Sequence, residues 1–589
     1  MSKKILYSFC AGAALLGMAS CSNDNVDGPS IVTPDNAVGY AKVSINFPTQ
    51  SGTRGFNGYE NGSAEEQAVS SIKLALYDSD GKFVGTGEKV SDDLNASSNG
   101  AGSNVSNLFT NVFKLYLNEG EEYPSKVIAF INTDIKPGSL EDLANGVAIN
   151  VDKETLGAEN NFPMTNSGYY TDDNGGEWVI ASEFTYDASE NGTVFDTQAA
   201  AEAASTTLAA TIYVERLAAK VTVSKGEVVE DLNYRVEDVN GKDLTLTFNP
   251  TNWSVTGFAK QENVVKSVFN KENLFTEYNK AADHRSFWAN ATNWALGFDS
   301  YYDTASKKIA ANSPLDYISF ADIKAEDSTT GDNVFDLSKL TAIGESEYAP
   351  EHTTVLGGEA ENLLANTYAI VVGNYTVSGE NAAWFQNGDA TKFYLLLKGM
   401  DGDKKVYTAY TKSQLIGLLL SYNGVNEVYD SFNNKYATKP GAAGYSPTFK
   451  FSDYFDIVYG NEGKYVLGAK ADASGTLYAE ANGQSPIEYS STWTKTTNSR
   501  HYYFPNGGAY FNVPIVHAVN GDDTFYGLVR NHTYKLTINK IENLGAPIDE
   551  NGHDENDPIV PDIDELKDHF INAQIEILSW HVVENGVTL

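Results

Sequence analysis

Short stretches in which apolar and polar residues alternate are the feature that most constrains the fold of this chain. Residues 41–47 read Ala-Lys-Val-Ser-Ile-Asn-Phe, and residues 71–77 follow the same period of two. Such alternation predicts β-strands that bury one face against a core. The pattern returns in segments 126–132, 211–214, 219–223, 243–248, 393–398, 407–410 and 533–539. Many short strands separated by Gly, Asn and Asp turns favour an all-β chain built from β-sandwiches.

The composition agrees with packed cores and argues against several kinds of partner. A chain of 589 residues is too long for one core, which predicts about two to four domains. Hydrophobic residues make up 41% and aromatic residues 12%, which argues against wholesale disorder. The formal net charge of −37 argues against nucleic acid or an anionic membrane surface, because both require clustered positive charge. Helix is a minor component, with 199–204 and 415–420 as the best candidates.

The N-terminus has the features of a secretory signal peptide. Lys3 and Lys4 precede an apolar run that begins at Ile5 and ends in Gly17-Met18-Ala19-Ser20, directly before Cys21. The run is shorter than the roughly 20 apolar residues of a membrane-spanning helix. Small residues before a cysteine resemble a bacterial lipobox, in which Cys21 is cut free, acylated and becomes the first residue. The alternative is an ordinary signal peptide with an incidental cysteine.

The cysteine count bears on how the protein is stabilised. The two cysteines of the chain are Cys10, within the leader, and Cys21. The part that follows them has no cysteine, which excludes disulfides, thiolate metal sites and cysteine nucleophiles there. Durability outside the cell therefore requires another source.

A segment rich in Ser, Gly and Thr follows the first alternating strand. Pro48 ends that strand, and residues 49–57 surround the pair Arg54-Gly55. Arginine is scarce in this chain, and an arginine in such a setting is accessible to a trypsin-like protease. Taken alone, an ordinary loop arginine is the simpler interpretation.

The chain ends in another apolar segment. Its apolar residues are Ile575, Ile577, Leu578, Trp580, Val582, Val583, Val587 and Leu589. Their spacing changes phase after Ile577, as at a β-bulge, and Asn585 interrupts the apolar face near the end. Such a segment is either a strand supplied to another chain or an edge strand that completes its own domain.

No catalytic signature stands out. The eight histidines are scattered, and the chain has no His-Glu-x-x-His, Gly-x-Ser-x-Gly or phosphate-binding Gly/Lys motif. Spacing alone neither supports nor excludes the carboxylate pair of a glycosidase in so acidic a chain. His517 and His532 are expected to be packed core residues. We therefore expect no enzyme and no cofactor.

The acidic stretch 549–568 raises the question of a calcium site. It holds Asp549, Asn551, His553, Asp554 and Asp557 close together. An EF-hand loop needs glycine at its sixth position, where this chain has Asp554. A solvated connector without a metal is therefore the favoured interpretation, and a calcium site there is left open.

Five segments together resemble the fimbrillins of Bacteroidales, the pilins of type V pili. They are the lipobox, the strand and turn of 65–81, the motif at 214–221, residues 502–517 around Gly507-Gly508, and the C-terminal run 531–580. The C-terminal run is the most specific and resembles that of minor-fimbrium shaft pilins. Residues 260–490 match only loosely.

The resemblance implies two transthyretin-like β-sandwich domains with long loops and a few short helices. It also implies an outer-membrane lipoprotein precursor that an Arg-specific protease cuts after Arg54, leaving Gly55 as the first residue. The cut releases the lipid with a removable strand, and a C-terminal donor strand from a neighbouring copy fills the vacated groove. The removable strand carries Ala41, Val43, Ile45 and Phe47, and the donor strand carries the C-terminal apolar residues given above.

On this pattern the chain divides into a signal peptide (1–20), a lipidated propeptide (21–54), an N-terminal domain (55–225) and a C-terminal domain (226–589). The expected partners are other copies of the chain, other pilus subunits, the protease, and host or bacterial surface receptors. The product is a cell-surface fimbria used for adhesion. Two alternatives are a glycan-binding surface lipoprotein, whose 35 Tyr and 7 Trp stack on sugars, and a tip or accessory adhesin.

Overall fold

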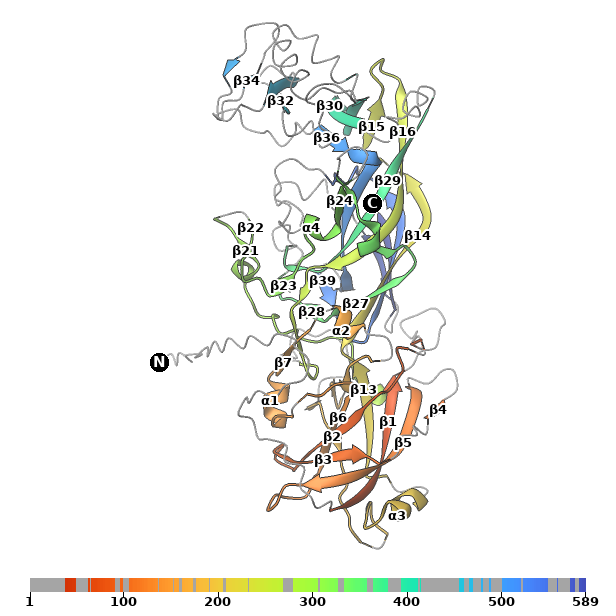
Figure 1. Ribbon diagram of the computed structural model, residues 1–589, viewed down its shortest axis with the longest axis vertical. Helices are drawn as coiled ribbons and strands as arrows, with labels where there is room; N and C mark the ends of the chain where they lie inside the picture. Colours follow the sequence, from red (N-terminus) through yellow and green to blue (C-terminus); the bar gives the residue numbers. More distant parts are fainter. Residues whose placement is uncertain are drawn as a thin grey trace.

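The computed structural model describes residues 38–48, 62–414 and 501–548 with gaps, the strands within 455–488, residue 559, and two C-terminal strands. These residues are almost entirely β with sandwich-like packing of sheets, which confirms the predicted fold class. Figure 1 shows an elongated molecule, with the N-terminal strands at the lower end and the long strands of the C-terminal half above them.

Near the N-terminus, the described strands form a ten-stranded sheet. Most of it runs in the order β12-β1-β13-β8-β6-β2-β3-β5-β4, and β11 pairs with β6. Its members are β1 (Gly39–Pro48), β2 (Ile72–Tyr77), β3 (Phe83–Lys89), β4 (Ala96–Ser98), β5 (Val105–Leu117), β6 (Lys126–Ile131), β8 (Met164–Asn166), β11 (Ser182–Glu183), β12 (Val194–Phe195) and β13 (Ala210–Arg216). Because β1 pairs with both β13 and β5, the sheet closes on itself around an apolar core.

The turn between β2 and β3 shows how local chemistry fixes the register of this sheet. Asp78 Oδ1 accepts hydrogen bonds from the backbone N–H groups of Asp80, at 3.0 Å, and Lys82, at 2.8 Å. Gly81 has a φ of 82°, a conformation that glycine adopts without steric cost. Residues 78–81 therefore form the turn of a hairpin between β2 and β3.

Two sheets dominate the described part of the C-terminal half. A nine-stranded sheet contains β15 (Tyr234–Glu237), β16 (Asp243–Thr256), β26 (Thr341–Ala342), β29 (Tyr368–Ser378), β30 (Phe393–Asp401), β31 (Lys404–Tyr410), β36 (His501–Phe504), β37 (Gly508–Pro514) and β41 (Ala546–Pro547). A five-stranded sheet has the order β27 (Ser346–Pro350), β14 (Ala218–Glu230), β40 (Thr533–Ile541), β43 (Val582–Thr588) and β42 (Ala573–Ile577). Both sheets contribute side chains to a second large core, in which Trp253 is fully buried.

Smaller elements surround these sheets. The α-helices among the described residues are α1 (Leu140–Ala144), α2 (Lys153–Leu156), α3 (Gln198–Ala203) and α4 (Phe320–Ile323), and the 3-10 turns are η1 (Ala281–Asp283), η2 (Phe298–Ser300), η3 (Leu337–Lys339) and η7 (Pro505–Gly507). The two-stranded pairs are β7 (Ala148–Asn150) with β18 (Gln261–Asn263), β9 (Tyr169–Tyr170) with β10 (Trp178–Val179), β17 (Phe258–Ala259) with β23 (Leu315–Asp316), β19 (Asn279–Lys280) with β20 (Arg285–Ser286), β21 (Tyr302–Asp303) with β22 (Lys308–Ile309), and β24 (Lys324–Glu326) with β25 (Asn333–Phe335). The remaining sheets are β28 (His352–Thr353), β38 (Val516–Asn520) and β39 (Asp523–Leu528), and β32 (Phe455–Tyr459), β33 (Tyr465–Ala469), β34 (Tyr478–Ala479) and β35 (Ile487–Glu488).

Helix content agrees with the sequence where it is described. Helix α3 lies at the expected place, and Thr197 caps it by accepting a hydrogen bond from the Ala200 N–H. The other expected helix, at 415–420, lies outside the described residues. Within the described part of the chain, no helix combines the length and apolarity needed to cross a bilayer.

The chain passes from the first core to the second within a few residues. Val214 on β13 packs in the first core, whereas Ala219 and Val221 on β14 pack in the second. Leu217 lies between the two strands and is fully buried. The domain division at 225/226 stays a prediction, and the first residues of β14 pack with the C-terminal sheets.

Candidate functional site

Strand β1, which contains the residues of the predicted removable strand, lies between two other strands of its sheet. It pairs antiparallel with β5, from Gly39 opposite Leu115 to Pro48 opposite Val105. It also pairs parallel with β13, from Val43 opposite Ala210 to Asn46 opposite Tyr213, and antiparallel with the short β12 at Tyr40 and Ala41. In Figure 1, β1 lies beside β5 at the lower end of the molecule. Withdrawing β1 would leave hydrogen-bonding groups on β5 and β13 without these partners.

The buried face of β1 forms part of the first core. Ala41, Val43 and Ile45 are each 0% exposed and pack in the core that includes Phe113 and Ile212. Ser44 and Asn46 on the opposite face are also buried, which differs from the expectation of a single buried face. The difference arises because β1 has a strand on each side, so that little of it reaches solvent. The side chain of Phe47 lies outside the described residues.

Specific contacts hold β1 to helix α3 and the segment that follows it. Lys42 Nζ donates hydrogen bonds to the backbone carbonyls of Glu202, at 3.1 Å, and Ala204, at 2.6 Å. The Ala209 N–H donates to the Lys42 carbonyl at 2.8 Å. Lys42 thus satisfies carbonyl groups at the C-terminal end of α3, which have no partner within the helix. These contacts fix the position of β1 along its neighbours.

The segment just beyond the predicted cut is fixed at the junction between the two cores. The described chain resumes at Gly62, and the side chain of Glu66 is 1% exposed. Glu66 Oε1 lies 2.7 Å from Lys220 Nζ on β14 and accepts a short hydrogen bond from the Tyr348 hydroxyl on β27. The Glu66 carbonyl accepts from Arg216 Nε at 2.8 Å. This segment therefore contacts strands of both halves.

The electrostatics of this junction favour the ionised form of Glu66. Burial opposes ionisation, but Lys220, Tyr348 and Arg216 together hold the pKa of Glu66 below its usual value. Burial also lowers the pKa of Arg216, to about 10, which leaves it charged at neutral pH. Ser63 completes the arrangement, because its N–H donates to Glu66 Oε2 at 2.6 Å and its hydroxyl accepts from the Glu66 N–H at 3.3 Å. These are the reciprocal bonds of a capping box, here on a turn.

A second ion pair lies fully buried near the junction. Lys266 Nζ is 2.7 Å from Glu215 Oε2, with 0% and 1% of the two side chains exposed. Lys266 Nζ also donates to the Ser286 carbonyl at 3.0 Å. Sequence reasoning did not single out Glu66, Glu215 or Lys266 for such roles. The available signal was the charged pair Glu215-Arg216 within an otherwise apolar strand.

The C-terminal strands lie within the five-stranded sheet of their own subunit. β43 pairs parallel with β40, from Thr533 opposite Val582 to Lys540 opposite Thr588. On its other side β43 pairs antiparallel with β42. β43 therefore has one parallel and one antiparallel neighbour, whereas β1 has the parallel neighbour β13 and two antiparallel neighbours, β5 along its length and β12 at Tyr40 and Ala41.

Only some of the predicted site residues lie in the described part of the chain. Of the donor-strand residues, Ile575 and Ile577 lie on β42, and Val582, Val583 and Val587 lie on β43. The predicted residues outside the described part of the chain are Cys21, Arg54, Gly55, Leu578, Trp580 and Leu589. Removal of β1 and donation of β43 stay predictions.

The histidines singled out from the sequence are packed in the core. His517 is 4% exposed on β38, and its Nδ1 lies 2.8 Å from the Tyr534 hydroxyl. His532 is fully buried directly before β40. In the described residues, no three His, Cys, Asp or Glu side chains are grouped as around a metal ion. The acidic stretch 549–558 lies outside those residues.

Comparison with known proteins finds one family model that matches the C-terminal region. Residues 502–586 match the family described as major fimbrial subunit protein type IV, fimbrillin, C-terminal. No curated protein matches the chain. The matched region runs from β36 through most of β43 and thus includes β40 and the predicted donor.

Solved structures show more distant similarity. A protein of Parabacteroides distasonis described as a cell adhesion protein is 12% identical, with 58% of this chain and 80% of that chain covered and a TM-score of 0.27. A fimbrial assembly protein of the same species is 13% identical, with 58% and 98% covered and a TM-score of 0.22. The fimbrial anchor protein Mfa2 of Porphyromonas gingivalis is 10% identical, with 63% and 96% covered and a TM-score of 0.17. The similarity of this chain to the fimbrillin family rests on residues 502–586.

Proposed function

We propose that this chain is a structural subunit of a cell-surface fimbria that polymerises by exchange of β-strands. The precursor is a lipoprotein anchored through Cys21, and an Arg-specific protease cuts it after Arg54. Loss of β1 then opens the first sheet, and the C-terminal strand of another copy takes its place. The fimbrillin match over residues 502–586 supports the fimbrial assignment.

The position of β1 between β5 and β13 is the observation that favours this mechanism. Withdrawal of β1 leaves the edge of β5 on one side and the edges of β13 and the short β12 on the other. The edges of β5 and β13 specify an incoming strand that is antiparallel to β5 and parallel to β13. β43 already adopts that combination beside β40 and β42. Strand exchange of this kind requires no disulfide, which suits a chain without cysteine after Cys21.

The energetics also support replacement of β1 rather than a permanently open groove. Burying Val43 and Ile45 contributes roughly 1.5–3 kcal/mol for each side chain. An empty groove would expose Phe113 and Ile212 from the same core to water. A donor whose Val583, Val587 and Leu589 share one face, interrupted by Asn585, can restore much of this burial, and its main chain can restore the hydrogen bonds.

Processing is tested first. Arg54→Ala should give unprocessed precursor and no polymer, whereas Arg235→Ala, at a partly buried arginine on β15, should be processed normally. N-terminal sequencing of the surface form should find Gly55 in the wild type. A blocked, acylated Cys21 on mature wild-type protein would instead support an anchor or glycan-binding lipoprotein. Normal polymers from Arg54→Ala would refute the mechanism.

Donation is tested at the C-terminus. Val587→Asp and Thr588→Asp add the same charge at adjacent positions, which point to opposite faces of a strand. If the face with Val583 and Val587 enters the groove, Val587→Asp should abolish the ladder of polymers in unboiled SDS gels and Thr588→Asp should weaken it less. Truncation of 583–589 should leave monomers. A normal ladder from the truncated chain would exclude the donor assignment.

A further inference from the structure

We propose that a pocket on the nine-stranded sheet binds a neutral sugar residue of a surface glycan. The pocket has a volume of about 410 Å³, within the range of small-ligand sites. Its residues come from segments far apart in sequence: Thr251 on β16, Glu326 on β24, Val334 and Phe335 on β25, Leu337 on η3, Gly373 and Asn374 on β29, Asn506 on η7, Gly508 on β37, and Ile548. This site is distinct from β1 and goes beyond the proposed polymerisation.

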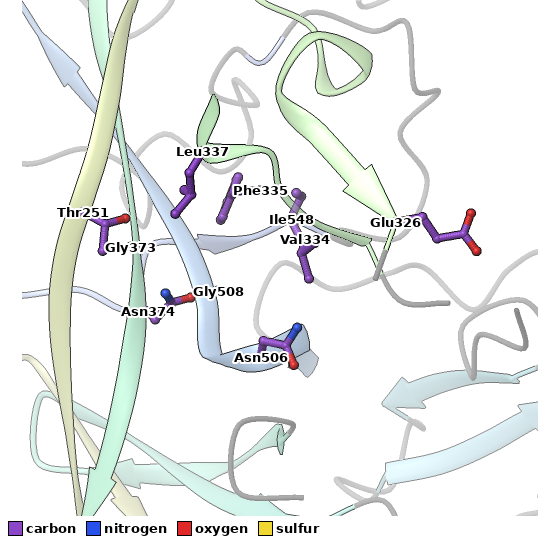
Figure 2. Close-up of a pocket in the computed structure, with 10 residues that line it drawn as sticks. All are labelled: Thr251, Glu326, Val334, Phe335, Leu337, Gly373, Asn374, Asn506, Gly508 and Ile548. Carbon is purple, nitrogen blue, oxygen red and sulfur yellow. The ribbon is translucent and has the colours of Figure 1, made fainter. Parts of the chain in front are cut away.

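One side of the pocket is apolar. Figure 2 shows Val334, Phe335, Leu337 and Ile548 grouped together beneath the β25–η3 segment. Leu337 is 44% exposed although it is a large apolar residue, so it presents apolar surface at the rim. Phe335 packs edge-on against Tyr510, with ring centroids 6.5 Å apart, which fixes its ring. Such a wall suits the apolar C–H face of a pyranose ring.

The other side of the pocket presents polar groups of the kind that bind hydroxyls. Asn374 and Asn506 carry amides, each with donors and an acceptor, and Thr251 adds a hydroxyl. Figure 2 shows Asn374 and Thr251 on the sheet side, opposite the apolar group. The exposed side chain of Asn374 has no hydrogen-bond partner among the described residues, so its amide is available to a ligand.

The turn that carries Asn506 is fixed in place. Asn506 and Gly507 have φ values of 52° and 69°, so two consecutive residues adopt the left-handed conformation. A Cβ added to Gly507 would lie 2.7 Å from the Tyr375 carbonyl oxygen, which shows how closely the turn packs against β29. The backbone at Asn506 is therefore fixed beside the pocket before any ligand arrives, and less backbone entropy is lost on binding.

The charge of the lining selects among ligand classes. The ten lining residues include no Lys, Arg or His, and the one charged residue is Glu326. In Figure 2 the Glu326 carboxylate points away from the other side chains, at the edge of the pocket. An anionic sugar would find no counter-charge here and would meet the field of a chain with net charge −37. A neutral hexose or N-acetylhexosamine fits the lining better.

The test uses the full chain and methyl glycosides of glucose, galactose, mannose, N-acetylglucosamine and sialic acid, followed by saturation-transfer NMR and titration calorimetry. We expect a neutral glycoside to bind in the millimolar range. Asn374→Ala, and Asn506→Gly, which keeps the left-handed turn, should each weaken binding about tenfold. Asn118→Ala, at an exposed asparagine in the N-terminal half, should leave binding unchanged.

Several outcomes would overturn the proposal. They are no binding of any glycoside by the wild type, equal binding by all three variants, or stronger binding of the sialoside than of every neutral sugar. The pocket variants should polymerise like the wild type. The ladder in unboiled gels therefore reports on the proposed polymerisation, and the titration reports on the pocket, so the failure of one is distinguishable from the failure of the other.

Discussion

Ile45→Ala is the substitution that most directly separates the roles of β1 before and after processing. Ile45 is 0% exposed, and its backbone lies opposite Ile212 on β13 and Phe109 on β5. The change deletes three carbons, worth about 0.8 kcal/mol each in transfer free energy, and leaves a cavity that adds to the cost. We expect the uncleaved protein to lose about 2–5 kcal/mol of stability in its first sheet.

Hydrogen exchange of the uncleaved protein measures this loss locally. A loss of 2 kcal/mol should accelerate exchange of β5 and β13 amides by about 30-fold where exchange follows opening of the sheet. Val38→Ala is the matched control, because Val38 precedes β1 and is 43% exposed; its effect should stay within about 0.5 kcal/mol.

The processed form provides the decisive comparison. On the proposed mechanism β1 is absent from the polymer, so polymers made from Ile45→Ala precursor should match the wild type in β5 and β13 protection. Faster exchange in those polymers would mean that β1 stays in the assembled subunit. Equal protection of Ile45→Ala and Val38→Ala precursors would refute the packing argument itself.

Three further predictions concern buried charge. Glu66→Gln removes the ion pair with Lys220 and should lower the melting temperature at pH 7. Because the pKa of Glu66 is lower in the folded state, the carboxylate stabilises the fold above the unfolded pKa of about 4.5, and this stabilisation is lost as pH falls through the folded pKa. The melting temperatures of the variant and the wild type should therefore converge in acid. Burial lowers the pKa of His517 to about 3, so the neutral imidazole stabilises the fold fully above pH 6.5, and this stabilisation declines as pH falls. Urea titrations should show about 2 kcal/mol less stability at pH 5 than at pH 7.5 from this group. His517→Gln should remove that part of the dependence of stability on pH. Lys266→Met leaves Glu215 buried without its ion-pair partner and should cost about 3–5 kcal/mol in urea unfolding, whereas Lys266→Met with Glu215→Leu should recover much of the loss; equal stability of the single and double variants would contradict this explanation.

The elements predicted from sequence are those in which local pattern and burial agree. Segment 71–77 alternates, and β2 occupies it almost to the residue because Ile72, Leu74 and Leu76 face the first core. The strand predicted at 243–248 instead continues to Thr256, through Pro250. The pairing register shifts between Pro250 and Asn252, as at a bulge, so the strand passes the proline without losing its neighbour. β29 was not predicted, because its residues 369–372 are continuously apolar and show no alternation.

The candidate sites were likewise predictable only where a local sequence pattern reveals them. The strand at 41–47 is visible in the sequence, but its neighbours are not, because β5 and β13 lie far along the chain and one pairing is parallel. The burial of Ser44 and Asn46 follows from those neighbours. The sugar pocket draws on segments from Thr251 to Ile548. No local spacing connects these segments, so only the folded sheet brings them together.

The docked position of β43 constrains how strand exchange is driven, if the chain polymerises as proposed. A donor strand must leave β40 and β42 before it can pair with β13 and β5 of another copy. It thus gives up β40 and β42 as partners and gains β13 and β5, with the two-residue β12 as a short further partner, so main-chain hydrogen bonds contribute little net free energy. The net gain must come from covering the core side chains that β1 leaves exposed, such as Phe113 and Ile212. While β1 is in place this gain is absent, so release of the C-terminal strand from the precursor is not favoured. Removal of β1 then determines when polymerisation begins.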